Sequence, residues 1–169
     1  MVWDTQRLRM VSQREVEPAR IVRVEFEIVG DVQGQRMVVY GVYMPVRTAA
    51  AEATEVKRVW DKLIHRVTCD GPNTWVIGDI NAETQGFIAR KQSKHGRTMQ
   101  DADRYFARLR AAARLQLTAQ GRPTHRAGGE IDHVLAPEHV GCLAGRARIE
   151  PGVGKRGGDH IVVTICSEH

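Results

Sequence analysis

The stretch Thr74-Trp75-Val76-Ile77-Gly78-Asp79-Ile80-Asn81-Ala82-Glu83 decides the fold and carries the first candidate chemistry. Its apolar run, Trp75–Ile77, is short and rich in β-forming residues, which is typical of a buried strand. Asp79 and Asn81 follow two residues apart, so on an extended chain both project to the same side. A carboxylate can accept a proton from water, and an amide can donate to a phosphate oxygen. Taken alone, the motif is more typical of a strand followed by an Asp/Asn turn.

The composition indicates a globular, basic chain. Its 169 residues suit one domain, and 42% hydrophobic with 27% charged residues argues against disorder. No apolar run reaches membrane-spanning length and no signal-peptide pattern is present, so we expect an intracellular protein, nuclear or cytoplasmic, neither secreted nor bound to membranes. Three scattered cysteines form neither a metal pair nor a disulfide framework. The excess of 25 Lys and Arg over 20 Asp and Glu favours a polyanionic partner such as nucleic acid.

Upstream of the central stretch, the pattern predicts a hairpin and a helix. Residues 1–18 are polar and without a clean period, and we interpret them as a poorly defined leader. Arg20–Val29 alternates apolar and polar residues and Met37–Tyr43 is more fully apolar, which together predict a β-hairpin. A helix capped by Thr48 follows and ends at Gly71-Pro72. Its apolar face is formed by Val56, Val59, Trp60, Leu63, Ile64 and Val67.

Downstream, the chain continues with one helix and several short strands. Gln85–Gly96 is expected to be a polar, basic loop, and Thr98 opens a helix with Tyr105, Phe106, Leu109 and Ala113 on one face. Short strands are expected near Leu115–Thr118, Ile131–Leu135, Ala144–Ile149 and His160–Cys166. The order of strands and helices predicts one layered α/β domain over residues 1–169, with a mixed sheet.

Polar clusters stand at four of the predicted strand ends. They are Tyr43-Met44-Pro45, Asp79-Ile80-Asn81, Ile131-Asp132-His133 and Asp159-His160. Each cluster alone fits a turn, a cap or a core-edge residue. In this order and spacing, however, they resemble the endonuclease/exonuclease/phosphatase superfamily, which includes pancreatic-type deoxyribonucleases, apurinic endonucleases and the endonucleases of non-LTR retrotransposons. The resemblance runs from about Ile21 to Ile165. The segment Pro123-Thr124-His125, followed by Glu130–Leu135, is most similar to the retrotransposon branch.

The resemblance implies a role for each cluster in metal-dependent phosphodiester hydrolysis. Asp79 would orient and deprotonate the attacking water, and Asn81 with Tyr43 would hold the phosphate. His160 would stabilise the charged transition state while Asp132 orients its ring. Asp159 would bind the cofactor, Mg²⁺ (or Mn²⁺). DNA is the expected nucleic acid, bound through basic residues on two loops, namely Arg90, Lys91, Lys94, Arg97, Lys155 and Arg156.

The chain departs from the family pattern in three places. Gly158 replaces the usual Ser before Asp-His, and Ile80 replaces the usual Phe. The family also begins with a strand carrying an Asn and a strand ending in a metal-binding Glu. Glu15 and Glu17 lie in a polar stretch, and neither is assigned as that ligand. The resemblance therefore implies the C-terminal portion of such a domain, completed by a missing N-terminal segment or a partner chain. The isolated chain is expected to be a poor enzyme.

Two other functions remain open at this stage. One is a phosphatase of the same superfamily that acts on a small or lipid phosphate. The excess of basic residues in the chain argues against this function. The other is a catalytically impaired remnant that serves as a binding or assembly module. Retention of the four polar clusters argues for the enzyme, while the unassigned metal-binding Glu argues for the remnant.

Overall fold

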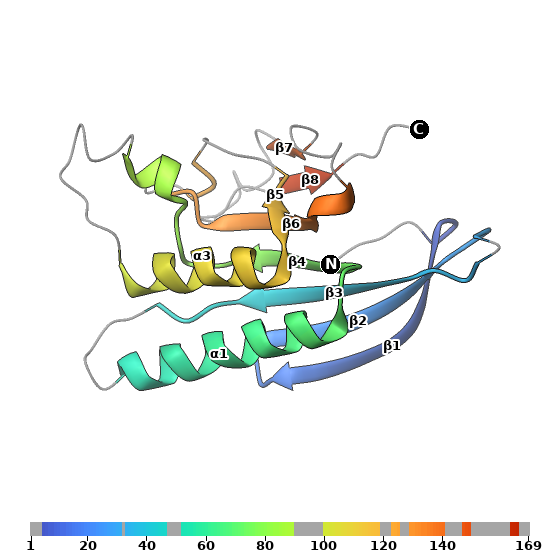
Figure 1. Ribbon diagram of the computed structural model, residues 1–169, viewed down its shortest axis with the longest axis horizontal. Helices are drawn as coiled ribbons and strands as arrows, with labels where there is room; N and C mark the ends of the chain where they lie inside the picture. Colours follow the sequence, from blue (N-terminus) through green and yellow to red (C-terminus); the bar gives the residue numbers. More distant parts are fainter. Residues whose placement is uncertain are drawn as a thin grey trace, which may run out of the picture.

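A six-stranded sheet forms the centre of the structure (Figure 1). The computed structural model describes residues 5–31, 33–46, 52–89, 100–118, 123–125, 129–140, 147–149 and 163–165. Across the sheet the strands are β1 Leu8–Glu17, β2 Ile21–Ile28, β3 Arg36–Tyr43, β4 Thr74–Asp79, β6 Asp132–Pro137 and β5 Leu115–Leu117. The β3–β4 pair is parallel and the other pairs are antiparallel, so the predicted mixed α/β fold is confirmed.

The predicted hairpin and the helix that follows it are both present. β2 pairs antiparallel with β3, with Val24 opposite Val39. The chain then passes through α1, Glu52–Asp70, into β4, which runs parallel to β3. Parallel neighbours need such a crossover, because the chain must return to the same end of the sheet. Gly71 follows α1 with a φ of 86°, a conformation that glycine adopts at no steric cost. The expected cap, Thr48, lies outside the described residues.

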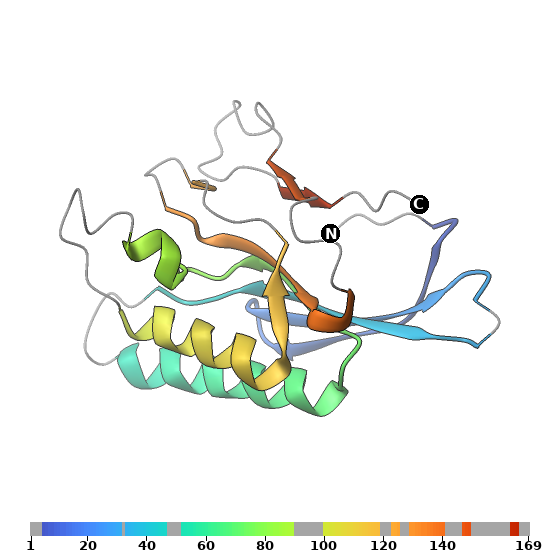
Figure 2. The ribbon, with the colours of Figure 1, turned by 45° about the horizontal axis from the view of Figure 1, so that its top comes forward.

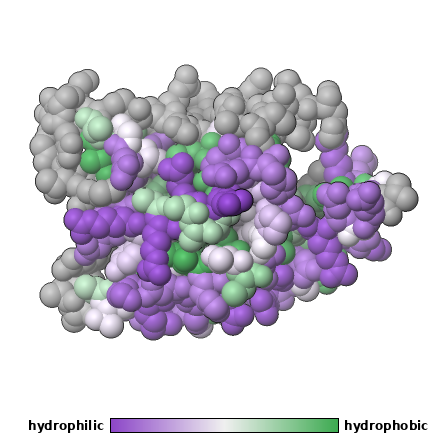
Figure 3. Space-filling view, in the orientation of Figure 1, coloured by the Kyte–Doolittle hydropathy of each residue, from purple (hydrophilic) through white to green (hydrophobic). Residues whose placement is uncertain are grey.

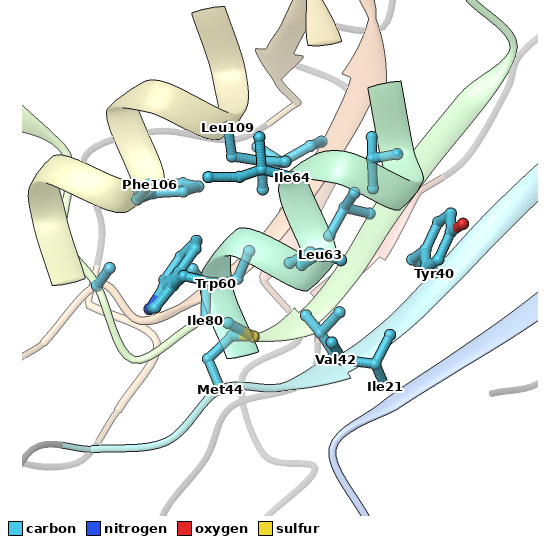
Figure 4. Packing of buried hydrophobic residues seen from close by; sticks show 14 of the residues in the cluster. Ile21, Tyr40, Val42, Met44, Trp60, Leu63, Ile64, Ile80, Phe106 and Leu109 are labelled. Atoms are coloured by element: carbon cyan, nitrogen blue, oxygen red, sulfur yellow. The ribbon is translucent and has the colours of Figure 1, made fainter. Parts of the chain in front are cut away.

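Two long helices cover one face of the sheet. α1 and α3, Asp101–Ala113, lie side by side there (Figure 2). Their apolar faces pack against the strands in the main core (Figure 4), which includes Ile21, Tyr40, Val42, Met44, Trp60, Leu63, Ile64, Ile80, Phe106 and Leu109. Each such burial contributes about 1.5–3 kcal/mol, so this layer is the main source of stability. α3 begins after Gln100, and the expected opening residue Thr98 lies outside the described residues.

A smaller apolar cluster lies on the opposite face. Val24, Phe26 and Val39 are buried in it, and Trp75 and Ile77 of β4 pack against them. The short antiparallel strands β7, Ala147–Ile149, and β8, Val163–Ile165, lie on this side of the sheet (Figure 2). Both fall inside segments predicted to be strands. α1 and α3 thus cover one face of the sheet, and β7 and β8 lie over part of the other, near β6.

The structure corrects the interpretation of residues 1–18 as a leader, because Leu8–Glu17 forms β1, the outer strand of the sheet as described. β1 shows no alternation of apolar and polar residues, because most of its side chains are exposed and the register of its pairing with β2 shifts twice. Its last residue is nevertheless buried. Glu17 is 8% exposed and accepts hydrogen bonds from Arg58 and Lys62 of α1. β1 is therefore fixed to the helical layer through its final carboxylate.

Two further contacts fix helix ends near the sheet. At the end of α1, Asp70 accepts hydrogen bonds from Arg23 Nε at 2.7 Å and from the Tyr40 hydroxyl at 2.5 Å. At the start of α3, the buried Asp103 accepts from the backbone N–H groups of Glu83 and Gln100, at 2.7 and 2.8 Å. This second contact joins the segment after β4 to α3. Residues 85–89, expected to be loop, form a short helical turn within that segment.

The described surface in the view of Figure 3 is mostly hydrophilic, with smaller apolar areas between the charged residues. No helix among the described residues is long and apolar enough to span a membrane. A 3₁₀ turn, η1 Glu138–Val140, follows β6.

Candidate functional site

The close approach of β4 to β3 depends on Gly78. This residue has a φ of 141°, and a Cβ atom here would lie 2.1 Å from the Val42 carbonyl oxygen. Any other residue would force the two strands apart, so the glycine of Gly-Asp-x-Asn is a requirement of strand pairing. As a consequence, Asp79 lies directly beside the end of β3.

Three of the candidate residues lie next to one another on adjacent strands. Tyr43 is opposite Asp79 in the β3–β4 pair, and Asp79 is opposite Asp132 in the β4–β6 pair. Because neighbouring strands are about 4.8 Å apart, these residues form a short row at the end of the sheet. We call Tyr43, Asp79 and Asp132 the cross-strand row.

The cross-strand row belongs to the face of the sheet away from the helices. Side chains alternate along a strand, so the neighbour of each row residue shows the orientation. Val42 packs in the main core below α1, and His133 packs against a phenylalanine of α3. Val76, three residues before Asp79, is also in the main core. The row residues therefore share the opposite face. Tyr43 is 52% exposed there, and the two aspartates are half-buried.

Asn81 is held differently from the sequence expectation. β4 ends at Asp79, and Asn81 has a left-handed φ of 50°, so the two side chains do not project from one extended strand. Instead, the Asn81 backbone N–H donates to Asp79 Oδ1 at 3.0 Å, and its side-chain Nδ2 donates to the Met44 carbonyl at 2.7 Å. Asparagine tolerates this conformation better than most residues. Asn81 thus joins the segments after β3 and β4 and orients the Asp79 carboxylate.

Thr124 fixes the backbone of Asp132, a role that sequence reasoning did not assign. Its side chain is buried, and Oγ1 accepts hydrogen bonds from the backbone N–H groups of Ile131 and Asp132, at 3.0 and 2.9 Å. The only sequence signal was the presence of Thr124 in the Pro-Thr-His segment. Both N–H groups are part-buried, and an unpaired buried N–H costs about 1–3 kcal/mol, so these two hydrogen bonds together contribute roughly that amount.

His133, the residue after Asp132, has a structural role. It is 3% exposed, and its Nε2 lies 2.8 Å from the Ala82 carbonyl oxygen, to which it donates. Burial lowers the pKa of His133 to about 4, although its hydrogen bond to Ala82 opposes this shift. The ring is therefore neutral near pH 7. It joins β6 to the segment after β4 on the helix side of the sheet.

Several predicted site residues lie outside the described residues. They are Asp159, His160, Arg90, Lys91, Lys94, Arg97, Lys155 and Arg156. The expected Asp132–His160 contact and the two basic loops therefore remain predictions. Within the described ranges, no three His, Cys, Asp or Glu side chains come together as metal ligands would. The described residues alone do not form a complete site for Mg²⁺ or Mn²⁺.

Two pockets lie away from the cross-strand row. One, of about 430 Å³, is lined by the segment after β4, by α3 and by β5, including Asp103, Phe106 and Arg110. The other, of about 710 Å³, lies between the ends of α1 and α3 and includes Val67 and Arg114. Neither contains a row residue. The row is instead on the sheet face opposite α1 and α3, where Tyr43 is its exposed end.

Comparison with known proteins shows the fold. No family model matches the chain, and no curated protein sequence matches it. A solved structure of a functionally unknown conserved protein from Enterococcus faecalis aligns with a TM-score of 0.53 at 14% identity, covering 94% of this chain and 66% of that one. The human Nocturnin catalytic domain with bound sulfate aligns with a TM-score of 0.56 at 12% identity, covering 95% and 62%.

A third similar structure is the AP endonuclease from Leishmania major, with a TM-score of 0.55 at 12% identity, covering 84% of this chain and 52% of that one. The chain thus spans between about half and two thirds of the length of these three proteins. At such low identity the likeness shows a shared α/β fold. It does not single out the retrotransposon branch that the sequence resembles.

Proposed function

We propose that the chain is a phosphodiesterase domain that hydrolyses nucleic acid, and most specifically a metal-dependent DNA endonuclease of the retrotransposon type. The observation that carries this proposal is the cross-strand row, in which two carboxylates and a phenol lie side by side with Asn81 bound to Asp79. Phosphodiester hydrolysis needs a proton acceptor for water and hydrogen-bond donors for the phosphate. The row and Asn81 contain both kinds of group.

In this proposal Asp79 accepts the proton of the water that attacks phosphorus. The hydrogen bond from the Asn81 N–H fixes the orientation of this carboxylate before substrate binds. The hydroxyl of Tyr43 and the second hydrogen of the Asn81 side-chain amide donate to phosphate oxygens. Asp132 orients His160, which stabilises the charge on the phosphate as the leaving oxygen departs. The hydrogen bond from the Asp132 N–H to Thr124 Oγ1 fixes the backbone of Asp132, which supports the role of Asp132 in orienting His160.

The proposed metal ligand is Asp159, with Mg²⁺ or Mn²⁺ as the ion. A hard divalent cation binds oxygen ligands and, when bound, would neutralise charge on the phosphate. Because Asp159 lies outside the described residues, no step above depends on the ion.

Nucleic acid is the substrate class that the charge of the chain and the exposure of Tyr43 favour. The net charge of +5 favours a polyanion, and the 52% exposed Tyr43 leaves one end of the cross-strand row accessible to a long strand. One of the similar structures is an AP endonuclease, which agrees with this choice. The basic loop residues, Arg90 to Arg97 and Lys155 with Arg156, are the proposed phosphate contacts around the site.

The test compares three substrates at high protein concentration, since the chain is shorter than its structural neighbours. Supercoiled plasmid, single-stranded RNA and para-nitrophenyl phosphate are incubated with the purified chain in Mg²⁺, in Mn²⁺ and in excess chelator. The proposal expects plasmid nicking that the chelator abolishes. Hydrolysis of para-nitrophenyl phosphate alone would support the phosphatase instead. Salt-sensitive binding of DNA with no hydrolysis under any condition would support the non-catalytic module.

A further inference from the structure

Arg20 lies beside the cross-strand row, at the start of β2. In the β2–β3 pair Ile21 is opposite Val42, and the Tyr43 backbone N–H donates to the Arg20 carbonyl at 2.8 Å. Arg20 therefore continues the row of Tyr43, Asp79 and Asp132 by one more strand. The four residues come from β3, β4, β6 and the turn that precedes β2.

The Arg20 side chain shares the face of the row. Ile21 packs in the main core on the helix side, so its neighbour Arg20 projects to the other face. The position of its guanidinium agrees, because the central carbon lies 5.0 Å from the centroid of the Tyr43 ring. A cation above an aromatic face within about 6 Å is attracted by the ring. The contact holds a positive charge at the open end of the site.

A tight turn fixes the backbone of Arg20. Ala19 has a φ of 53°, which is costly for a residue with a side chain. The turn is closed by two hydrogen bonds, from the Ala19 N–H to Glu15 Oε1 at 2.8 Å and from the Arg20 N–H to the Glu17 carbonyl at 3.0 Å. The side chain of Glu15 thus stabilises the conformation that places Arg20 beside Tyr43.

Arg20 is not among the six arginines of the described residues that form ion pairs with carboxylates. Arginines that form ion pairs with carboxylates are Arg9, Arg23, Arg36, Arg58, Arg104 and Arg108. Within the described ranges, Arg20 forms no ion pair. The pKa of Glu55 is lowered mainly by a hydrogen bond that this carboxylate already accepts from Arg58, and the charge of Arg20 adds to that effect. Its side chain is only half-buried. The planar guanidinium, which matches phosphate oxygens well, is left with donors for a ligand.

We propose that Arg20 binds a backbone phosphate of the nucleic acid, next to the phosphate that is hydrolysed at Asp79. This inference rests on the proposed function and adds a substrate contact to it. Two strand spacings, roughly 10 Å, separate the backbones of Arg20 and Asp79, so the arginine reaches a neighbouring nucleotide rather than the same phosphate. The exposed Tyr43 ring between them presents an aromatic surface to the intervening nucleotide.

The test measures duplex binding of the full chain by fluorescence anisotropy between 50 and 200 mM salt. Arg20→Ala is compared with Arg14→Ala, a matched control that removes the same charge from the opposite face. Arg14 is exposed on β1 and lies opposite Arg23, which contacts Asp70 on the helix side. Each phosphate contact contributes about 0.9 to the slope of log affinity against log salt. Circular dichroism and urea unfolding confirm that both variants fold.

Arg20→Ala is expected to reduce that slope by about one and to weaken binding roughly tenfold at low salt, while Arg14→Ala changes neither. Arg20→Lys should restore most of the slope, because it keeps the charge. If the wild-type chain binds DNA but Arg20→Ala and Arg14→Ala change the affinity and the salt slope equally, the Arg20 contact is overturned and the proposed function remains intact. Failure of the wild-type chain to bind duplex at low salt would overturn both.

Discussion

Glu17 allows a quantitative test of whether the first strand is an integral part of the fold. Its carboxylate accepts hydrogen bonds from Arg58 and Lys62, and these lower the pKa of Glu17 from 4.5 to about 2. Because the folded-state pKa is lower than the unfolded one, Glu17 stabilises the fold above about pH 4.5. That contribution is lost as the pH falls towards 2.

The size of the contribution follows from the exposure of the three side chains. A pKa shift of this size corresponds to at most about 3.4 kcal/mol. Although the Glu17 side chain is only 11% exposed, those of Arg58 and Lys62 are 45% and 37% exposed. Water and salt screen the two cations and solvate them when the partner is removed, so Glu17→Gln should cost about 1–2 kcal/mol at pH 7.

The assay is urea unfolding at pH 7 and at pH 3, with Glu27→Gln as the control. Glu27 also pairs with an arginine of β1, but the Arg9 and Glu27 side chains are 69% and 32% exposed, so its loss should change the unfolding free energy by less than about 0.5 kcal/mol. The difference between wild type and Glu17→Gln should shrink at pH 3. An unfolding free energy that Glu17→Gln leaves unchanged at pH 7 would refute the attachment of β1 to α1.

Two further substitutions test how the site is built. Gly78→Ala places a Cβ against the Val42 carbonyl and should lower the unfolding free energy by more than about 4 kcal/mol or prevent folding. Gly34→Ala, at a residue with a positive φ and open space around it, should lower it by about 1 kcal/mol. Equal unfolding midpoints for the two variants would contradict the close contact between β3 and β4. Thr124→Val removes the acceptor for two part-buried N–H groups and should cost about 1–3 kcal/mol, while Thr124→Ser, which keeps Oγ, should cost less than about 1 kcal/mol. Equal losses of unfolding free energy in urea would argue against that role.

The elements with a regular or continuous set of buried apolar residues were predictable from sequence. α1 buries one face in the main core, which produces the period of 3.6, and β2 alternates because Val24 and Phe26 face the smaller cluster while Ile21 faces the main core. β3 is buried on both faces, which produces its more fully apolar run. β1 has no such period because its side chains are mostly exposed and its pairing with β2 shifts twice. From sequence alone, residues 1–18 therefore resemble a polar leader. The single buried residue, Glu17, is charged, and its partners on α1 are far away in sequence.

The candidate site was predictable in its strand ends and less so in its local geometry. Tyr43, Asp79 and Asp132 are expected at strand ends from sequence, and they lie together because β3, β4 and β6 are neighbours in the sheet. The orientation of Asn81 was not predictable, because an Asn after a strand can either continue the strand or begin a turn. In the structure it turns, and its side chain donates a hydrogen bond to the Met44 carbonyl, which is distant in sequence. The placement of Arg20 depends similarly on a turn closed by side-chain and backbone contacts.

The most direct test of the proposed activity is plasmid nicking by Asp79→Asn beside the wild-type chain, with DNA binding measured on the same preparations. The substitution keeps the shape of the side chain and an oxygen that can accept the Asn81 N–H, so the fold should be unchanged. Loss of a general base typically lowers the rate by about 10²–10⁴-fold. A decrease of that size in the nicking rate is expected, with DNA binding retained. Nicking by Asp79→Asn at the wild-type rate would contradict this expectation.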